Sequence, residues 1–172
     1  MNKLRSVFAA SILTAMIVAL VYEPISLAMF HLVEPYFVCP IKSESGKVII
    51  RNDSHGDGEF GAKRNGGRFH SGIDIEAPVG TPVFAAKSGL AFCGNVPTGY
   101  GKYVMIYHPD SYQSFYGHLS GFCITSVKKV RKGDIIGFVG KTGNAANKNI
   151  APHLHFEIRK DGVPQDPRDL MK

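Results

Sequence analysis

Several features that define common protein classes are missing from this chain of 172 residues. It has no internal repeat and no low-complexity segment, and no stretch after residue 30 keeps a sustained helical periodicity. The chain is therefore neither a repeat protein nor mainly helical. It also lacks a nucleic-acid-binding motif, and we interpret its only dense basic run, Lys128 to Lys132, as a solvated turn. No nucleic-acid partner is expected.

Cysteine is scarce as well. The three cysteines, Cys39, Cys93 and Cys123, do not have the C-x-x-C spacing of a zinc or redox site, and an odd count leaves at least one unpaired. Cys93 and Cys123 each lie in an apolar, strand-like run, so buried thiols and a single disulfide are both open. A catalytic role is not expected of them.

The N-terminus indicates export. Lys3 and Arg5 precede a charge-free stretch from Ser6 to Tyr22, which is the pattern of a secretory signal. The stretch is shorter than the ~20 residues of a comfortable membrane span, although ~17 can suffice for a tilted helix. Ser26-Leu27-Ala28 offers small residues for cleavage. We predict that residues 1–28 are a signal peptide, with a retained signal anchor in the inner membrane as the alternative, and that the rest lies in the periplasm or cell envelope.

Glycine and proline are abundant, with 19 and 10 residues scattered among short apolar runs, which is typical of a β-rich fold with many turns. We interpret residues 29–68 as a connector and a polar, glycine-rich loop, and residues 69–172 as one domain. Apolar or alternating segments in this domain predict antiparallel strands. They are 73–75, 82–86, 89–93, 102–108, 111–116, 135–139 and 153–159. The predicted fold is mostly β and antiparallel.

Two motifs combine residues that bind metals. In His70-Ser71-Gly72-Ile73-Asp74, an imidazole and a carboxylate are separated by a glycine that lets the backbone bend, so that both could reach one ion. This spacing alone is common by chance. In His153-Leu154-His155, the two imidazoles project from one face of a strand. Burial of both is costly unless their nitrogens are satisfied, and a structural, hydrogen-bonded pair is the simpler alternative.

A third motif contains a single histidine, His118, within Tyr116-Gly117-His118-Leu119-Ser120. A lone histidine at a strand end is more often structural than catalytic. The presence of the other two motifs in the same domain reverses that preference.

The ordered set of motifs resembles the LytM/lysostaphin-type zinc endopeptidases, peptidase family M23. The resemblance covers roughly the last 100 residues, from about Phe69 to Asp169. Besides the three histidine motifs, it rests on Gly80-Thr81-Pro82-Val83, Ala86 through Gly89, Gly99-Tyr100-Gly101, Lys132-Gly133-Asp134, Ile136-Gly137, Gly140, Thr142-Gly143, the context Pro152 to Glu157, and Asp166-Pro167.

The resemblance implies a two-sheet, sandwich-like β domain with a groove where the motifs meet. It implies one zinc ion bound by His70, Asp74 and His155, with His118 and His153 as catalytic residues beside the metal. Three protein ligands leave the fourth tetrahedral position for water, whose pKa zinc lowers to about 7. One of the two catalytic histidines would take the water's proton, and the other would bind the developing oxyanion or protonate the leaving amine. The sequence leaves open which does which.

Two regions depart from the family pattern. Residues 144–152 are longer than the usual connection, which could reshape one wall of the groove. The loop before His70 lies where relatives can carry an inhibitory segment, so that Asn52, Asp53, His55, Asp57 or Asn65 could cap the zinc. A plain solvated loop is the favoured interpretation.

The sequence thus predicts an exported, monomeric zinc metalloendopeptidase that hydrolyses cross-links or stem peptides of bacterial peptidoglycan. A catalytically silent, envelope-binding activator of other wall hydrolases is the alternative, disfavoured because no metal position is substituted. An enzyme directed at a competitor's wall is less expected, because no separate wall-binding domain follows residue 172. The bond that is cut stays open, since D-Ala-diaminopimelate and Gly-Gly cleavage share this machinery.

Overall fold

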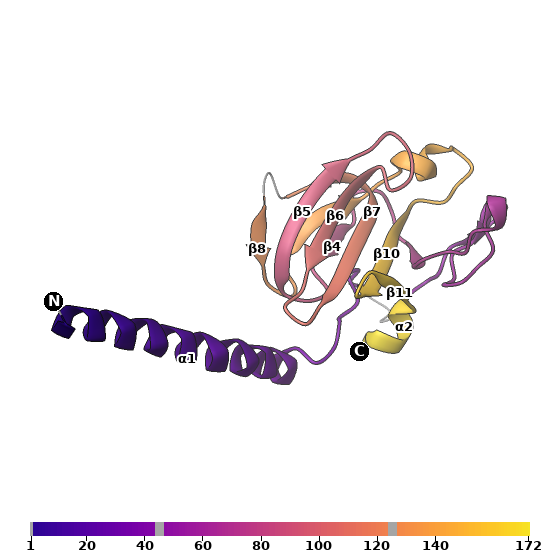
Figure 1. Cartoon of the computed structure of the whole chain (residues 1–172). Helices are drawn as coiled ribbons and strands as arrows, with labels where there is room; N and C mark the ends of the chain where they lie inside the picture. Colours follow the sequence, from indigo (N-terminus) through magenta and orange to yellow (C-terminus); the bar gives the residue numbers. More distant parts are fainter. Residues whose placement is uncertain (1, 44–46, 124–126) are drawn as a thin grey trace. The chain divides into compact units, whose positions relative to one another are not determined.

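The computed structural model describes residues 2–43, 47–123 and 127–172 (Figure 1). These divide into two compact units, Met1–Pro35 and Tyr36–Lys172, which we describe separately.

Helix α1 (Asn2–Val33) makes up most of the first unit. Its segment Ala10–Val33 has 24 residues and a mean hydropathy of 1.9, so it is long and apolar enough to cross a membrane. Its large apolar side chains are exposed, Leu20 by 73% and Leu32 by 77%. The helix includes Ser26-Leu27-Ala28, and cleavage there or retention of the helix as an anchor stays a prediction.

The second unit is mostly β and antiparallel, which confirms the predicted fold class. Its elements are β1 (Asn52–Asp53), β2 (Gly56–Asp57), η1 (Asn65–Gly67), β3 (Ile73–Glu76), β4 (Pro82–Phe84), β5 (Gly89–Asn95), β6 (Lys102–Tyr107), β7 (Tyr112–Phe122), β8 (Lys128–Val130), β9 (Ile135–Val139), η2 (Gly143–Ala146), β10 (His153–Lys160), β11 (Val163–Gln165) and α2 (Pro167–Leu170).

Within the described residues, nine strands form one hydrogen-bonded sheet (Figure 1). Six of them follow the order β11-β10-β7-β6-β5-β8, and the other three branch from it. Strand β3 pairs with β10, and β9 joins β7 to β4. The hairpin of β1 and β2 is separate. Strands β4 and β9 contribute Val83, Ile136 and Val139 to the same core as Ile106 of β6 and Phe156 of β10. The two predicted layers are therefore parts of one continuous sheet that shares one core.

The segment before β3 packs on the domain. The Phe37 side chain is 2% exposed, and the Val38 amide donates to the carbonyl of Ala86 at 2.9 Å. Farther along, the Arg51 amide donates to the carbonyl of Asp74 at 2.9 Å. Residues 36–43 and 47–68 therefore belong to the same compact unit as the large sheet. The division of the chain at residue 69 stays a prediction.

Two expectations need comment. The basic run from Lys128 is not a turn at its start, because Lys128–Val130 form β8 beside β5, with Val130 buried and both lysines exposed. Val130 at the end of this short strand is its one residue that packs inward. The cysteines, which all lie in the described part of the chain, form no disulfide, and Cys39 and Cys93 are half-buried while Cys123 is exposed, so neither the predicted disulfide nor fully buried thiols are found.

Candidate metal centre and active site

Strand β10 carries the centre of the site. His153, His155 and Glu157 alternate along it and therefore project from one face. The register of β3 against β10 places Asp74 opposite His155, and residues directly opposite on antiparallel strands share a face. His70 precedes β3, and its amide donates to the carbonyl of Ala62 at 2.9 Å. All of these side chains are buried.

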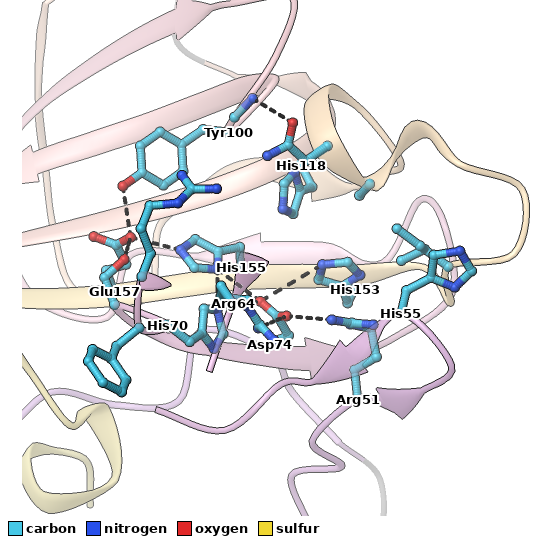
Figure 2. Close-up of a pocket in the computed structure, with 17 residues that line it drawn as sticks. Arg51, His55, Arg64, His70, Asp74, Tyr100, His118, His153, His155 and Glu157 are labelled. Carbon is cyan, nitrogen blue, oxygen red and sulfur yellow. Dashed lines mark hydrogen bonds and ion pairs between the residues drawn. The ribbon is translucent and has the colours of Figure 1, made fainter. Parts of the chain in front are cut away.

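The structure brings His70, Asp74 and His155 together as one group that could hold a metal ion (Figure 2). His155 Nδ1 lies 2.8 Å from Asp74 Oδ1 and 3.0 Å from His70 Nε2. His70 Nε2 lies 3.1 Å from Asp74 Oδ1. Zn–N and Zn–O distances of about 2.0–2.2 Å place tetrahedral ligand atoms roughly 3.3 Å apart. The three atoms thus fit a zinc site with only a small expansion.

The other ring nitrogens of these two histidines fix which nitrogen faces the metal position. His70 Nδ1 donates to the carbonyl of Glu59 at 2.9 Å, and His155 Nε2 donates to Glu157 Oε1 at 2.8 Å. When both rings are neutral, these contacts leave lone pairs on His70 Nε2 and His155 Nδ1 that face Asp74 Oδ1. Partners of this kind orient ligating histidines in metal sites. In that state three electron-pair donors converge, and either a metal ion or a proton between them offsets their repulsion.

The pKa shifts agree with that need. Burial opposes ionisation of Asp74, but hydrogen bonds from His155 and His70 hold its pKa well below the usual range. Burial also opposes protonation of His155, yet its contacts with Asp74 and Glu157 raise its pKa to about 9. A proton on His155 therefore competes with a metal ion for the same lone pair, and metal binding would release it.

We call His70, Asp74 and His155 the triad. His118 and His153 lie beside it without belonging to it. Their ring centroids are 4.9 Å apart, and His153 Nε2 is 3.9 Å from Asp74 Oδ1. His118 Nδ1 donates to the carbonyl of Thr142 at 2.9 Å, and His153 Nδ1 donates to that of Ala151 at 2.7 Å. Burial lowers the pKa of His118 to about 3 and also lowers that of His153. Both rings are therefore neutral, with Nε2 as a proton acceptor.

His118 reaches this place through an unusual backbone. It lies within β7 rather than at a strand end, and its φ is 62°, a left-handed conformation that is rare outside glycine. The pairing of β7 with β6 shifts register between Tyr116 and Leu119, and that with β9 shifts just beyond Leu119. The His118 amide donates to the carbonyl of Tyr100 at 2.7 Å. Strain of this kind occurs at functional sites, where surrounding contacts hold it.

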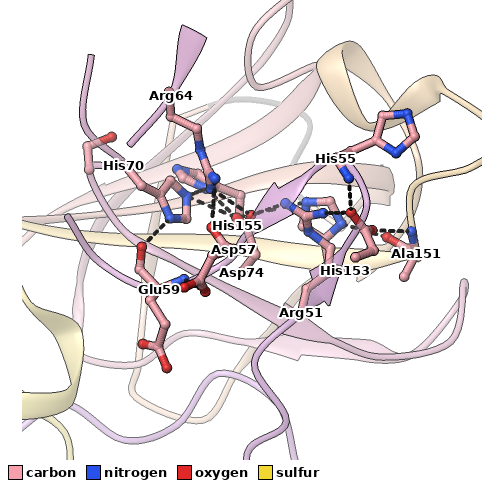
Figure 3. A network of polar contacts seen from close by, with 12 residues as sticks. Arg51, His55, Asp57, Glu59, Arg64, His70, Asp74, Ala151, His153 and His155 are labelled. Atoms are coloured by element: carbon pink, nitrogen blue, oxygen red, sulfur yellow. Dashed lines mark hydrogen bonds and ion pairs between the residues drawn. The ribbon is translucent and has the colours of Figure 1, made fainter. Parts of the chain in front are cut away.

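Two arginines that the sequence did not single out hold the outer oxygen of Asp74 (Figure 3). Arg51 Nη2 and Arg64 Nη2 lie 3.0 and 3.3 Å from Asp74 Oδ2. Arg51 Nη1 also contacts Asp53 Oδ1 at 2.6 Å. Asp74 thus presents Oδ1 to the metal position, while its Oδ2 accepts from the two arginines. Both arginines precede the quoted motifs, and their loop showed no signal except polarity.

Glu157 is a further site residue that was quoted only as part of a motif. It is fully buried, and its Oε1 accepts from His155, from the Ser71 hydroxyl and from the Tyr100 hydroxyl, the last at 2.8 Å (Figure 2). Its Oε2 accepts from Arg159 Nε at 2.8 Å. Its same-face spacing with His153 and His155 was the signal that could have identified it.

These residues line a groove of about 560 Å³. Of the loop residues considered as caps, His55 lines the groove, whereas the Asp53 carboxylate is engaged by Arg51 and by the Ala151 amide. Asp57 Oδ1 accepts from the Glu59 amide. Asn52 lies in β1, and the Asn65 side chain lies outside the described part of the chain.

Comparison with known proteins places this geometry in a family. The model of peptidase family M23 matches residues 68–167. DD-carboxypeptidase/endopeptidase Mpg of Neisseria meningitidis serogroup B is 44% identical over 100 residues, covering 58% of this chain and 22% of that protein. Peptidoglycan DD-endopeptidase ShyC of Vibrio cholerae is 36% identical over 103 residues, covering 60% and 23%.

Among solved structures, a zinc containing peptidase from Vibrio cholerae superposes with a TM-score of 0.59 at 28% identity, covering 77% of this chain and 39% of that one. The chain spans about a quarter or less of the length of the curated relatives named above. The matched residues include all three histidine motifs and more than half of the sequence. The chain is a member of peptidase family M23.

Proposed function

We propose that this chain is an exported, zinc-dependent endopeptidase that hydrolyses peptide bonds of bacterial peptidoglycan. The observation that carries the proposal is the convergence of His70 Nε2, Asp74 Oδ1 and His155 Nδ1, with two further buried histidines at its side. The names of the relatives Mpg and ShyC support the substrate, and the apolar helix α1 supports export to the periplasm or cell envelope.

In this proposal, His70, Asp74 and His155 hold one zinc ion, which when bound supplies a Lewis acid and an activated water. Among the described residues the cluster offers three protein ligands, as in catalytic rather than closed structural zinc sites. Glu157 and the Glu59 carbonyl orient the two ligating rings, and Arg51 orients Asp74.

His118 and His153 are the proposed catalytic residues. Each is anchored through Nδ1 to a backbone carbonyl, so Nε2 is the nitrogen available to reactants. A neutral Nε2 can take the proton of the attacking water, and a protonated Nε2 can give a hydrogen bond to the carbonyl oxygen or a proton to the leaving amine. Their burial in the groove wall restricts both rings to one orientation.

The test is peptide release from purified sacculi by the full chain in detergent, loaded with zinc. We expect soluble peptides from the wild type, none from His155→Ala, and wild-type release from His31→Ala, a control histidine in α1. Full release by His155→Ala would refute the proposed metal centre. Binding to sacculi without any release by the zinc-loaded wild type would refute the enzyme and favour the envelope-binding activator.

A further inference from the structure

The groove around the triad has a surplus of positive charge. Among the described residues that line it are three arginines, Arg51, Arg64 and Arg68, but only two carboxylates, those of Asp74 and Glu157. Both carboxylates are buried and already have partners. Asp74 contacts Arg51 and the two ligating histidines, and Glu157 contacts His155 and Arg159. A bound divalent metal adds charge of the same sign. The groove therefore favours an anionic ligand over a neutral one.

The two arginines at Asp74 differ in how far they are committed. The Arg51 side chain is 5% exposed, and its two terminal nitrogens contact Asp53 and Asp74 at 2.6 and 3.0 Å. The Arg64 side chain is 22% exposed, and its contact with Asp74 Oδ2 is longer, at 3.3 Å. Asp74 Oδ2 therefore has a shorter arginine contact that does not depend on Arg64.

Arg64 has donors to spare for such an anion. Its Nη1 donates to the backbone carbonyl of Asp57 at 2.6 Å, and its Nη2 donates to Asp74. A guanidinium carries five N–H donors in a planar fork that suits a carboxylate. The contacts with Asp57 and Asp74 need only two of the five, and the side chain is partly exposed.

The hairpin of β1 and β2 makes room for this guanidinium. Gly56 has a φ of 131°, which L side chains rarely adopt, and a Cβ at this residue would lie 2.9 Å from Arg64 Nη1. The hairpin backbone and the carbonyl of Asp57 thus form a seat for Arg64 beside the groove (Figure 3). Arg64 is therefore held in place rather than free in solvent.

The position of Arg64 relates it to the bond that is cut. The two oxygens of a carboxylate lie within about 2.5 Å of each other, since each C–O bond is about 1.2 Å long. Arg64 Nη2, at 3.3 Å from Asp74 Oδ2, is therefore no more than roughly 6 Å from Oδ1 in the triad. An extended peptide advances about 3.3–3.6 Å per residue. A group bound by Arg64 therefore lies within a few residues of the cut bond, and the proposal places it at the nearest of them.

We propose that Arg64 is a specificity-determining residue that binds a carboxylate of the substrate, so that the enzyme acts on peptides with a free carboxylate at or next to the cut bond and not on neutral, glycine-only peptides. This inference rests on the proposed peptidase function. The carboxylate can belong to a side chain or to the peptide's C-terminus, and the experiment separates these sources.

The kinetic test compares matched peptides cut by the zinc-loaded full chain in detergent. In the first set, a peptide with a free side-chain carboxylate next to the cut bond is compared with the same peptide bearing the primary amide there. In the second set, a peptide with a free C-terminus is compared with its C-terminally amidated form. A charge-assisted hydrogen bond predicts about a ten- to hundredfold higher kcat/KM for the free acid in the set that Arg64 recognises. Arg64→Met should bring that ratio close to one, Arg64→Lys should keep part of it, and Lys63→Met, an equal charge change at the neighbouring residue, should keep all of it.

A binding test makes the inference independent of catalysis. The Kd of each acid and amide is measured by calorimetry with the His153→Ala full chain, whose zinc content is determined in parallel. Tighter binding of one acid, lost in the double variant with Arg64→Met, supports the inference. Equal binding and equal cleavage of acids and amides overturn it while leaving the peptidase function intact. Failure of the wild type to cut any peptide contradicts the proposed function, and the binding ratio then still decides the role of Arg64.

Discussion

Replacing Glu157 by glutamine tests whether this buried carboxylate prepares the metal centre. In the wild type, Oε1 accepts from His155 Nε2 at 2.8 Å, and this contact leaves Nδ1 of the same ring as the lone pair aimed at the metal position. Glutamine has nearly the same shape but no charge. If the glutamine NH₂ group faces His155 Nε2, two donors face each other. If its oxygen faces His155 instead, the NH₂ group faces Arg159, which then has no carboxylate partner.

The structure sets the expected size of the effect. Glu157 is fully buried, so that water cannot replace the lost contacts. Loss of a carboxylate that orients a ligating histidine typically lowers metal affinity by 10- to 100-fold, which corresponds to about 1.4–2.7 kcal/mol. Tyr100→Phe removes one hydrogen bond to the same oxygen, of 2.8 Å, and keeps the ring that lies beside His155. We expect a smaller loss from this graded control than from Glu157→Gln, because the carboxylate and its contact with His155 are kept.

The assay is zinc affinity by competition with a chromogenic chelator, with circular dichroism as the measure of folding. The order of affinity should be wild type, Tyr100→Phe, Glu157→Gln. A folded Glu157→Gln protein with a zinc Kd within twofold of the wild type would refute the reasoning about His155.

Three further predictions concern stability and are measured by urea unfolding. Gly72→Ala should destabilise the domain by about 1–3 kcal/mol or more, because the new Cβ would overlap the carbonyl oxygen of Phe156. In the control Gly121→Ala, the new Cβ meets nothing within 4 Å, and stability should stay within about 0.5 kcal/mol of the wild type. Equal losses would contradict the packing argument. Asp110→Ala should cost about 3–5 kcal/mol of stability, because it removes the carboxylate that pairs with a buried ammonium. In the wild type, Lys87 is 2% exposed and its ammonium lies 2.5 Å from the Asp110 carboxylate. A loss below about 1 kcal/mol would show that this pair is not desolvated. Burial raises the pKa of Asp53, but its contact with Arg51 and the hydrogen bonds from the amides of Ala151 and His55 together lower it from 3.8 to about 2. The stability that Asp53 contributes is therefore present above pH 3.8 and is lost as the pH falls to about 2. Asp53→Asn should therefore lose less stability than the wild type over that interval, and identical acid profiles would contradict this account.

Much of the site was predictable because local periodicity determined it. The alternation of His153 and His155 in an apolar run requires a shared face in a strand, and β10 has this geometry. The four-residue spacing of His70 and Asp74 gave a plausible chelate, but only the register of β3 against β10 shows that Asp74 lies opposite His155. The resemblance to the M23 peptidases that the motifs suggested is confirmed by the family match. The roles of the five residues stay proposals.

The parts that sequence reasoning missed depend on long-range contacts. Nothing local indicates that Arg51 and Arg64, from a polar loop, meet the far oxygen of Asp74. The left-handed backbone at His118 follows from register shifts between β7 and its neighbours, and the pattern of apolar residues does not reveal it. Glu157 is different, because its spacing from His155 is the same alternation that identified the histidines.

The measurement that tests the central claim most directly is digestion of defined, cross-linked muropeptides by the full chain, followed by mass spectrometry of the products. The account predicts hydrolysis of a peptide bond that stops when a chelator removes zinc, resumes when zinc returns, and is absent in His155→Ala. Undigested muropeptides after incubation with the zinc-loaded wild type, or digestion that the chelator leaves unchanged, would contradict it.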